Sequence, residues 1–416
     1  VLATVLATPI LVATADYITP AGDLTQQAKQ IVPFWRVWSS DLILDEIDSY
    51  DPQSIVALLR LVQIAGMAGR NVIISSATIT PVLGAAIERC YWSGIKMFAA
   101  LHQQKAQFNG VILSDQTAGR EFWQVVQEPD TLKNLLTEYY QGAAQNLAAT
   151  TGYRKAQLTP VVRSPEGFKE AILNAILPLH QKQRIYAPEY EKYFSVGLIR
   201  VANIRTAQTI SAHLRRQATA QEDTVLYTVC YHAQLLNGQR ALIESILDQV
   251  LQRGQDERAV LRLPEVQAIM EREKCSNIVL IVVATPVEEV GRDHDFDWAI
   301  IEPSSVQSII QTAGRVNRHR KKPVVTENVA LLQYNMRYCR GEERCFIRPG
   351  NELGNTREYY KSHGLDELIN WERVGGYLDV RLLIEADHQP FSQADQKGYE
   401  LLLSDPVARL VAADSF

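Results

Sequence analysis

Two polar motifs that follow short apolar runs constrain the fold of this chain most strongly. The apolar run at 278–284 leads into Ala-Thr-Pro-Val-Glu-Glu-Val-Gly-Arg-Asp at 284–293, and the run at 298–302 precedes Gln-Thr-Ala-Gly-Arg-Val-Asn-Arg at 311–318. Apolar runs of this length predict buried strands. Because parallel α/β sheets place their ligand chemistry beyond the carboxyl ends of such strands, we predict an α/β fold with a site built from both motifs.

The second motif carries three side chains with helical spacing. Gln311, Arg315 and Arg318 are separated by four and three positions, so in a helix they lie on one face. Two guanidinium groups on that face can bind the terminal phosphate of a nucleotide and stabilise its charge during hydrolysis. Such arginines contribute roughly 10³ to 10⁵ in rate. The alternative is a solvated basic helix end, since further basic residues follow at 320–322.

Carboxylates follow an apolar run in the first half of the chain. The segment 41–48 predicts a short buried strand that ends in Asp45 and Glu46. In a nucleotide-dependent motor Asp45 would hold Mg²⁺ through its water shell, and Glu46 would orient and help deprotonate the attacking water. An acidic loop that caps the next helix is the alternative. A second apolar strand, one βα unit later, leads to Ser76 and Thr78.

These motifs carry a resemblance to a known family. In their order and spacing they resemble the later motifs of superfamily 2 helicases, at 45–48, 76–78, 285–293 and 311–318. Softer similarity comes from the tract at 11–16, from Tyr-His-Ala-Gln at 231–234 and from the long connection between the halves. In these features the chain resembles the helicase-nuclease of type I CRISPR interference, in particular the type I-F form fused to an adaptation subunit.

The resemblance implies a fold and a function. It implies two RecA-like parallel-sheet domains that bind ATP between them and move along single-stranded DNA, in a cytoplasmic helicase-nuclease that degrades invading DNA in antiviral CRISPR immunity. The implied cofactors are ATP and Mg²⁺, with nuclease metal ions only in an upstream domain. The implied partners are single-stranded DNA, a crRNA-guided surveillance complex, adaptation proteins and phage-encoded inhibitors, with no membrane.

The resemblance also implies roles for single residues. Catalytic roles fall on Asp45, Glu46, Arg315 and Arg318. Nucleotide contacts fall on Gly291 by close backbone approach, on Asp293 to the ribose or as a bridge to the arginines, and on Gln311. Coupling and nucleic-acid contacts fall on Thr14, Ser76, Thr78, Asn203 and Thr285. Asn203, with Arg205, is assigned by its position after a strand, where turn residues have the same appearance.

The phosphate-binding loop of such motors is not in this sequence. No Gly-x-x-x-x-Gly-Lys-Ser/Thr occurs, and no Gly-Lys pair. We interpret the chain as a C-terminal fragment that begins inside the first domain and lacks the nuclease, and we expect this chain alone to be inactive as an ATPase. His294 and Asp295 form an HD dipeptide, but no other His lies nearby to complete a nuclease metal site.

The order of apolar and polar segments predicts four parts. Residues 1–104 are the distal part of an incomplete first RecA-like domain and include a strand at 10–14. Residues 105–190 are a helical linker or insertion, because they are too long for a simple connection. Residues 191–332 are the second RecA-like domain, and residues 333–416 are a C-terminal accessory domain.

Composition narrows the class of protein. The formal net charge of −5 argues against binding to DNA by bulk attraction, but it allows a motor whose positive charge is confined to a channel. Basic residues at 315–348 alternate with Tyr334, Tyr338 and Phe346, which suits stacked bases; a solvated surface over core aromatics is the alternative. Five scattered cysteines, an odd number, fit a reducing cytoplasm better than a disulfide framework.

Two other functions stay open. One is another superfamily 2 DNA or RNA helicase, for repair or RNA remodelling. The other is a catalytically inactive, motor-derived module that binds nucleic acid or a protein. The pairs Asp45 with Glu46 and Arg315 with Arg318 weigh against the inactive module, because a dead site has no chemical need for both.

Overall fold

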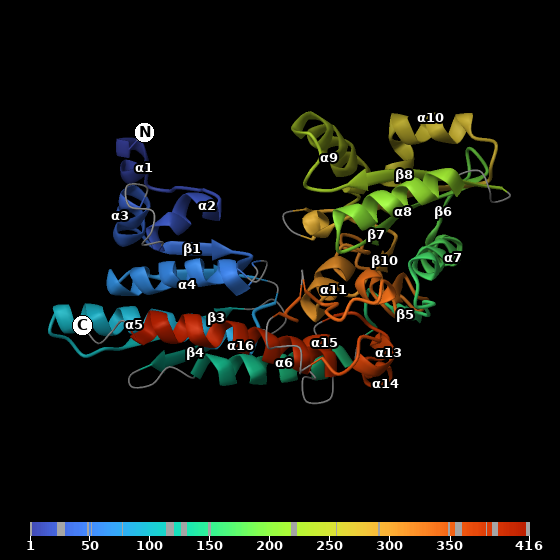
Figure 1. The fold of residues 1–416 in the computed structure, drawn as a ribbon. Helices are drawn as coiled ribbons and strands as arrows, with labels where there is room; N and C mark the ends of the chain where they lie inside the picture. The colour runs from blue at the N-terminus through green and yellow to red at the C-terminus, as the bar shows by residue number, and fades with distance from the viewer. Residues whose placement is uncertain are drawn as a thin grey trace. The chain divides into compact units, whose positions relative to one another are not determined.

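The computed structural model describes most of the chain and divides it into two compact units. The described residues are 2–22, 30–47, 50, 52–76, 78–113, 120–125, 131–148, 151–217, 223–254, 256–289, 292–347, 350–353, 360–379, 381–384 and 390–412. Unit 1 comprises Val1–Ala143 with Gln396–Phe416, and unit 2 comprises Ala144–Asp395. Figure 1 labels their elements. Among the described residues, no helix is long and apolar enough to cross a membrane.

Unit 1 is built around two short parallel strands and two long helices. Strands β1 (Leu42–Asp45) and β2 (Val72–Ser75) pair in parallel. Helix α4 (Pro52–Met67) packs closely on α5 (Pro81–Leu101). Glycines permit this close packing, since a Cβ at Gly94 would lie 2.2 Å from the carbonyl oxygen of Gln63.

The remaining elements of unit 1 surround this pair of helices. They are α1 (Leu2–Ala7), α2 (Ala15–Ile18), η1 (Thr19–Gly22), α3 (Ile31–Ser39), the antiparallel β3 (Phe108–Leu113) and β4 (Arg120–Val125), and α6 (Thr131–Ala148). The C-terminal helix α16 (Pro390–Ala412) adds Leu403 and Val407 to the core of unit 1.

Unit 2 is a seven-stranded sheet with helices on both faces. Six strands run parallel in the order β5 (Ala156–Thr159), β11 (Val329–Leu332), β10 (Trp298–Ile301), β7 (Lys192–Arg200), β9 (Asn277–Ala284) and β8 (Thr224–Tyr231). The seventh, β6 (Ile185–Ala187), pairs antiparallel with β7. Such doubly covered parallel sheets explain why these strands are continuous apolar runs. The α/β fold class predicted from the sequence is confirmed.

Alternate residues of β9 show which helices cover which face. Val279 and Val283 share a core with α7 (Pro165–Gln183) and α8 (Ile204–Gln217). Ile278 and Val282 share a second core with α9 (Asn237–Leu251) and α11 (Val306–Ala313). Smaller elements complete the unit: η4 (Glu257–Arg262), α10 (Pro264–Arg272), η5 (Pro286–Glu288), α12 (Met336–Cys339), α13 (Leu365–Leu368), α14 (Trp371–Val374) and α15 (Arg381–Ile384).

Several sequence predictions need correction. The strand predicted at 10–14 is irregular chain that precedes α2. Strand β1, predicted to be buried, exposes Ile43 (67%), and its partner β2 exposes Ile73 (54%), because the described part of unit 1 covers only one face of this small sheet.

The predicted four-part division stays a prediction, but the structure assigns one stretch differently. Within the expected linker at 105–190, strand β5 pairs with β11 and helix α7 packs on the unit 2 sheet. The partner of β5 lies more than a hundred residues away, so local sequence gives no sign of this pairing.

A buried carboxyl group links α16 to the start of α11. Asp395 Oδ2 accepts a hydrogen bond from the backbone N–H of Val306 at 2.7 Å, and Oδ1 accepts one from the hydroxyl of Tyr360 at 2.8 Å. Burial raises the pKa of Asp395 to about 7, although both hydrogen bonds oppose the rise. The protonated carboxyl is therefore favoured in the folded state.

We predict that Asp395→Asn flattens the pH dependence of stability. A carboxyl whose folded pKa is raised contributes stability that is present below its ordinary pKa of 3.8 and is lost as the pH rises towards about 7. Urea unfolding should show that the wild type loses more stability than the variant when the pH is raised from 5 to 8. Equal losses in both proteins would contradict this assignment.

Candidate functional site

The parallel pairing of β1 and β2 places the two predicted motifs of unit 1 side by side. Asp45 lies opposite Ser75 in the register, and the backbone N–H of Glu46 donates to the carbonyl of Ser75 at 2.8 Å. Glu46 has a left-handed backbone with φ +50°, which costs energy for a residue other than glycine and is common at functional sites. Because Asp45 pairs with Ser75, the two acidic residues lie next to the segment that begins at Ser76. Asp45 is exposed and Glu46 is half-buried.

Ser76, Thr78 and Thr14 differ in their surroundings. The backbone N–H of Thr78 donates to Ser76 Oγ at 3.1 Å, and Thr78 is buried. Thr14 is exposed just before α2, and its carbonyl accepts from the N–H of Tyr17 at 3.0 Å. Its hydroxyl makes no capping bond to that helix. Ala77, between the two hydroxyl residues, lies outside the described residues.

In unit 2 the carboxyl ends of the parallel strands gather Asn203 and Thr285 at one edge of the sheet. Ala284, the last residue of β9, is level with Arg200 of β7 and Tyr231 of β8. Thr285 is buried and donates its N–H to the carbonyl of Tyr231 at 3.2 Å. Asn203 is half-buried, and Arg205, which follows in the first turn of α8, is exposed.

The predicted shared helical face of Gln311, Arg315 and Arg318 is wrong. Helix α11 ends at Ala313, so Gln311 lies on the helix whereas the two arginines lie in the turns beyond it. Gly314 still has helical dihedrals, but Asn317 has a left-handed backbone with φ +51°, which a continuing helix does not allow. The arginines are therefore placed by tertiary contacts rather than by helical spacing.

The two arginines have different environments. Arg315 is buried, and its guanidinium donates to the backbone carbonyls of Glu289 and Arg292, which belong to the other motif. Arg318 keeps 40% of its side chain exposed, and its Nε donates to Asp293 Oδ1 at 2.7 Å. The structure thus brings the two motifs together. Gly291 lies outside the described residues.

Asp293 is held in its charged form beside Arg318. The neighbouring His319 lowers the pKa of Asp293 most; burial opposes this, and Arg318 lowers the pKa further. His319 Nε2 lies 3.0 Å from Asp293 Oδ1. A carboxylate between two basic groups can hold a guanidinium in place while leaving its other N–H groups available to an anion.

Buried acids fix the turn that carries Arg318. Asp295 is fully buried and accepts from the backbone N–H of Arg318 at 3.0 Å and from two nitrogens of Arg320 at 2.8 and 2.9 Å. Asp297 binds Arg320 at 2.7 Å and Arg253 at 2.5 Å. Burial would raise the pKa of Asp297, but Arg253 and Arg320 lower it below its ordinary value. Arg320 is therefore structural, contrary to the solvated basic end considered from the sequence.

A second buried ion pair lies beneath Arg315. Arg200, at the end of β7, donates Nε to Glu289 Oε1 at 2.5 Å and has no solvent exposure. Glu289 also accepts from the hydroxyls of Ser308 at 2.7 Å and Thr312 at 3.3 Å, both on α11. One carboxylate thus ties β7, the first motif and the helix of the second motif together.

Sequence reasoning missed these buried partners. Glu289 and Asp295 stand inside or beside the first motif, but Arg200, Arg253 and Asp297 carry no motif signal. Two of them have a local sign, since Arg200 is the last residue of strand β7 and Asp297 directly precedes strand β10; Arg253 follows helix α9 and has none. Isolated charges next to buried strands are expected to be paired.

The structure gives no metal-binding cluster in its described part. No group of three or more His, Cys, Asp or Glu residues there could hold a metal ion. His294 of the HD dipeptide is buried between Glu288 at 2.5 Å and Asp248 at 2.9 Å, so both of its nitrogens are used in hydrogen bonds. Phe346, considered for base stacking, is fully buried core.

The residues of unit 1 still suit Mg²⁺ of one particular kind. Mg²⁺ that acts on nucleotides is bound by one or two carboxylates, water and the substrate phosphates, so it needs no cluster of protein ligands. Asp45 is an exposed carboxylate at the carboxyl end of a parallel strand, which fits that role.

Comparisons with known proteins find similar sequences. A family model described as "CRISPR-associated nuclease/helicase Cas3, C-terminal" matches residues 194–321. A protein of Pectobacterium atrosepticum, described as CRISPR-associated nuclease/helicase Cas3 subtype I-F/YPEST, is 32% identical over 377 residues, which cover 88% of this chain and 34% of that protein. Its counterpart in Pseudomonas aeruginosa is 33% identical over 396 residues, covering 92% and 35%.

Solved structures share the fold. The crystal structure of T. fusca Cas3 with ATP aligns with a TM-score of 0.59 at 16% identity, covering 99% of this chain and 42% of that one. At this identity the likeness concerns the fold. The chain spans about a third of the length of the curated relatives it matches.

We predict that Glu289→Gln strongly destabilises unit 2. The substitution keeps the volume but leaves the fully buried Arg200 without its carboxylate, which typically costs about 3–5 kcal/mol. The measurement is urea unfolding of the full chain. Glu257→Gln is the matched control, because its pair with Lys322 is about half exposed and such pairs contribute about 0–1 kcal/mol. A loss for Glu289→Gln no larger than the control would contradict the role of the pair.

Proposed function

Because the chain is homologous over most of its length to the type I-F Cas3 nuclease/helicases, we propose that it supplies the helicase part of an ATP-dependent, single-stranded-DNA translocase. The complete protein is a helicase-nuclease that degrades invading DNA in CRISPR immunity. The observation that carries this proposal is the contact between Arg318 and Asp293, which joins the two motifs at a half-exposed guanidinium. A guanidinium held in this way suits a phosphate.

Unit 1 supplies the carboxylates for hydrolysis. Asp45 would hold Mg²⁺ through water, and the ion would supply positive charge at the phosphates of ATP. Glu46 orients the attacking water and accepts its proton. The left-handed backbone of Glu46, anchored by its bond to Ser75, supports this role because it fixes the backbone from which the side chain projects.

Unit 2 supplies the arginines, with distinct tasks. Arg318 stabilises the terminal phosphate during hydrolysis, and Asp293 orients it. Arg315 acts as a positioning residue in the described conformation, because its guanidinium is bound to the backbone of the other motif. Gln311 on α11 and Gly291 contact the nucleotide by resemblance to the family.

The residues assigned to the DNA strand follow parallel strands in each unit. Ser76 and Thr78 follow β2 next to the carboxylates, and Asn203 and Thr285 follow adjacent strands of unit 2. Hydroxyl and amide groups of this kind hold nucleic-acid phosphates without reading sequence. Thr14 is assigned to the same task. Hydrolysis would change their hold on the strand and so produce movement.

The partners follow from the same proposal. A crRNA-guided surveillance complex recruits the complete protein to its DNA in the cytoplasm, and adaptation proteins and phage-encoded inhibitors are further partners. The chain alone hydrolyses no ATP, because its sequence contains no phosphate-binding loop.

ATP hydrolysis by this chain, and by the complete protein, with and without single-stranded DNA, tests the function. DNA-stimulated hydrolysis that needs the complete protein would support the proposal. Hydrolysis by the chain alone would contradict the assignment of the phosphate loop to sequence upstream. Silence in both, with strand binding retained, would favour an inactive binding module.

We predict that Arg318→Ala in the complete protein lowers DNA-stimulated ATP hydrolysis by about 10³-fold or more while leaving single-strand binding largely intact. The loss follows from the missing charge at the terminal phosphate. Lys321→Ala is the control, since it removes a nearby exposed cation. Normal turnover by the Arg318 variant would exclude its catalytic role.

We also predict that Glu46→Gln lowers the maximal rate of ATP hydrolysis by about 10²- to 10⁴-fold, because the amide cannot accept a proton. ATP binding, measured by equilibrium titration, should change little. Glu191→Gln removes an exposed carboxylate elsewhere and should leave the rate unchanged. A variant that hydrolyses ATP normally would rule out Glu46 as the base.

A further inference from the structure

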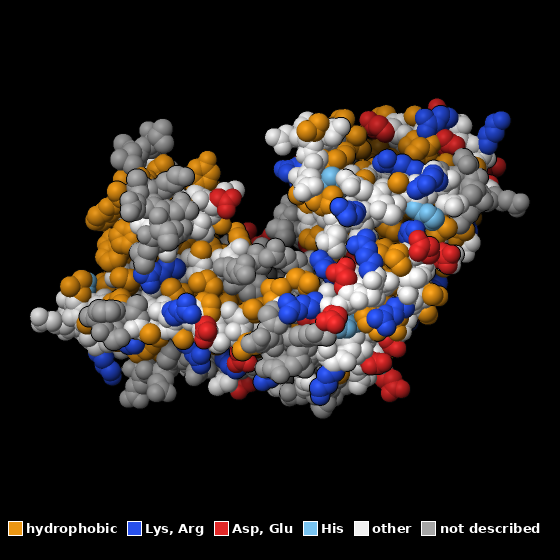
Figure 2. All heavy atoms as spheres, in the orientation of Figure 1, with side chains coloured by type: hydrophobic (Ala, Val, Ile, Leu, Met, Phe, Trp, Pro, Cys, Tyr) orange, Lys and Arg blue, Asp and Glu red, His pale blue; other side chains and the backbone are white. Residues whose placement is uncertain are grey.

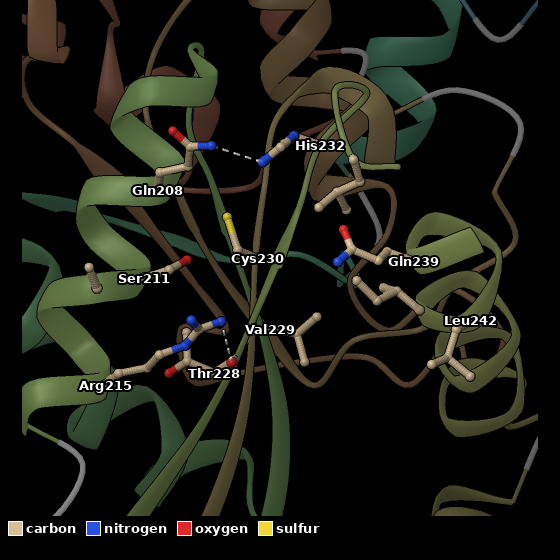
Figure 3. A pocket seen from close by; sticks show the side chains of 12 residues that line it. Gln208, Ser211, Arg215, Thr228, Val229, Cys230, His232, Gln239 and Leu242 are labelled. Atoms are coloured by element: carbon tan, nitrogen blue, oxygen red, sulfur yellow. Dashed lines mark hydrogen bonds between the residues drawn. The ribbon is translucent and has the colours of Figure 1, made fainter. Parts of the chain in front are cut away.

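A groove runs along the free edge of the unit 2 sheet. Strand β8 is last in the strand order and pairs with β9 alone among the described strands. The groove has a volume of about 520 Å³ and lies between α8 and α9 with β8 as its floor (Figure 3). We call it the β8 groove. Neither the proposed hydrolysis nor the proposed strand contacts use its residues.

The backbone of β8 presents hydrogen-bonding groups to this groove. The carbonyls of Asp223 and Tyr231 accept bonds from the β9 side, so odd-numbered residues face β9. N–H and C=O groups of one residue point to the same side of a strand, and neighbours alternate. Thr228 and Cys230 therefore direct theirs outwards. The Thr228 carbonyl receives a long bond of 3.4 Å from Arg215.

The two walls of the β8 groove lie on opposite faces of the sheet and differ in chemistry. The α8 wall is polar and includes Gln208, Ser211 and Arg215. The α9 wall is largely apolar and includes Leu242, which is 63% exposed, and Ile243. Side chains of a strand alternate between the faces of a sheet, so a strand added beside β8 would meet one wall with each set.

Buried polar atoms in the groove have no partner among the described residues. Ser211 Oγ and His232 Nδ1 are such atoms, in side chains that are 2% and 5% exposed, and Thr228 Oγ1 is a third. His232 Nε2 lies 3.3 Å from the amide nitrogen of Gln208, so as an acceptor there it leaves the proton on Nδ1. Figure 3 shows the Ser211 hydroxyl directed into the space beside Cys230. These atoms have almost no exposed surface, so they lie within the wall of the groove, and a bound segment would reach them only if that wall shifted.

The charge of the polar wall indicates which side chains of a bound segment it would attract. Helix α8 contains Arg205, Arg215 and Arg216 but no acidic residue. No residue that lines the groove is acidic. An acidic side chain is therefore the complement of Arg215.

We propose that the β8 groove binds an extended peptide segment of a protein partner, which adds a strand beside β8, places apolar side chains against α9 and sets an acidic side chain at Arg215. The outward backbone of Thr228 and Cys230 favours a peptide over nucleic acid, because it supplies both donors and acceptors. The lining also contains no Phe, Tyr or Trp on which bases could stack.

The test uses three acetylated octapeptides with the full chain. One alternates Glu with Val, one alternates Lys with Val, and one alternates Glu with Pro, which cannot donate along a strand. Binding is measured by fluorescence anisotropy, and amide hydrogen exchange is followed over residues 224–232. The Glu–Val peptide should bind at least ten-fold more tightly than either other peptide and slow exchange in this segment.

Matched variants locate the contacts. Arg215→Glu should weaken the Glu–Val peptide at least ten-fold and favour the Lys–Val peptide. Arg216→Glu makes the same change of charge one residue away, outside the groove lining, and should have little effect. Leu242→Asp, at an exposed position that requires no repacking of the core, should weaken the Glu–Val peptide through the other wall.

Several outcomes would overturn the proposal. Equal binding of the Glu–Pro peptide would show attraction by charge without an added strand. Unchanged exchange over 224–232 would place the peptide elsewhere. A single-stranded oligonucleotide that slows exchange in this segment and displaces the peptide would assign the β8 groove to nucleic acid instead.

Discussion

The buried pair of Arg200 and Glu289 is the interaction on which the arrangement of unit 2 depends. Glu289 belongs to the segment after β9, Arg200 to the end of β7, and the hydroxyls that complete the network to α11. Removing such charges from water is costly, and the cost is met only when the whole network forms. The two motifs are separated in sequence by a strand and a loop. The network therefore holds the first motif in one position relative to Arg315 and Arg318 of the second.

The buried and the exposed charged residues of unit 2 have different roles. Deeply buried charges, Asp295 and Asp297 with Arg253 and Arg320, fix the backbone of the turn and carry no exposed chemistry. The backbone of Arg318 is held by these buried charges, whereas its side chain is partly exposed and can contact a ligand. Preorganised charge of this kind is effective at a phosphate because it needs little rearrangement when the charge develops. Unit 1 shows the same principle on a smaller scale, since the Glu46 backbone is fixed by Ser75 and its carboxylate is not.

Much of this could be predicted from the sequence, and the exceptions have physical causes. The strands β1 and β2 lie where their apolar runs predict, and β9 begins within one residue of its prediction, because a run of branched apolar residues has few alternatives beside a core. The end of α11 could not be predicted, since helical spacing continues through Gly314 to Arg318 while the tertiary bonds of Asp295 set a turn there. Strand β5 pairs with a strand more than a hundred residues away, and Asp297 pairs with arginines from separate elements. A single sequence carries no signal for either contact.

One feature of unit 1 affects the behaviour of the molecule in solution. Ile43 and Ile73 project from the uncovered side of β1 and β2, and Trp35 and Val12 are exposed elsewhere on the unit, where Figure 2 shows hydrophobic side chains at the surface. Water disfavours such surface by about 25 cal/mol per Å². Two molecules that meet by these sides would hide it from water, so the purified chain should be least soluble when concentrated or in strongly salting-out buffers, and mild detergent should keep it dispersed.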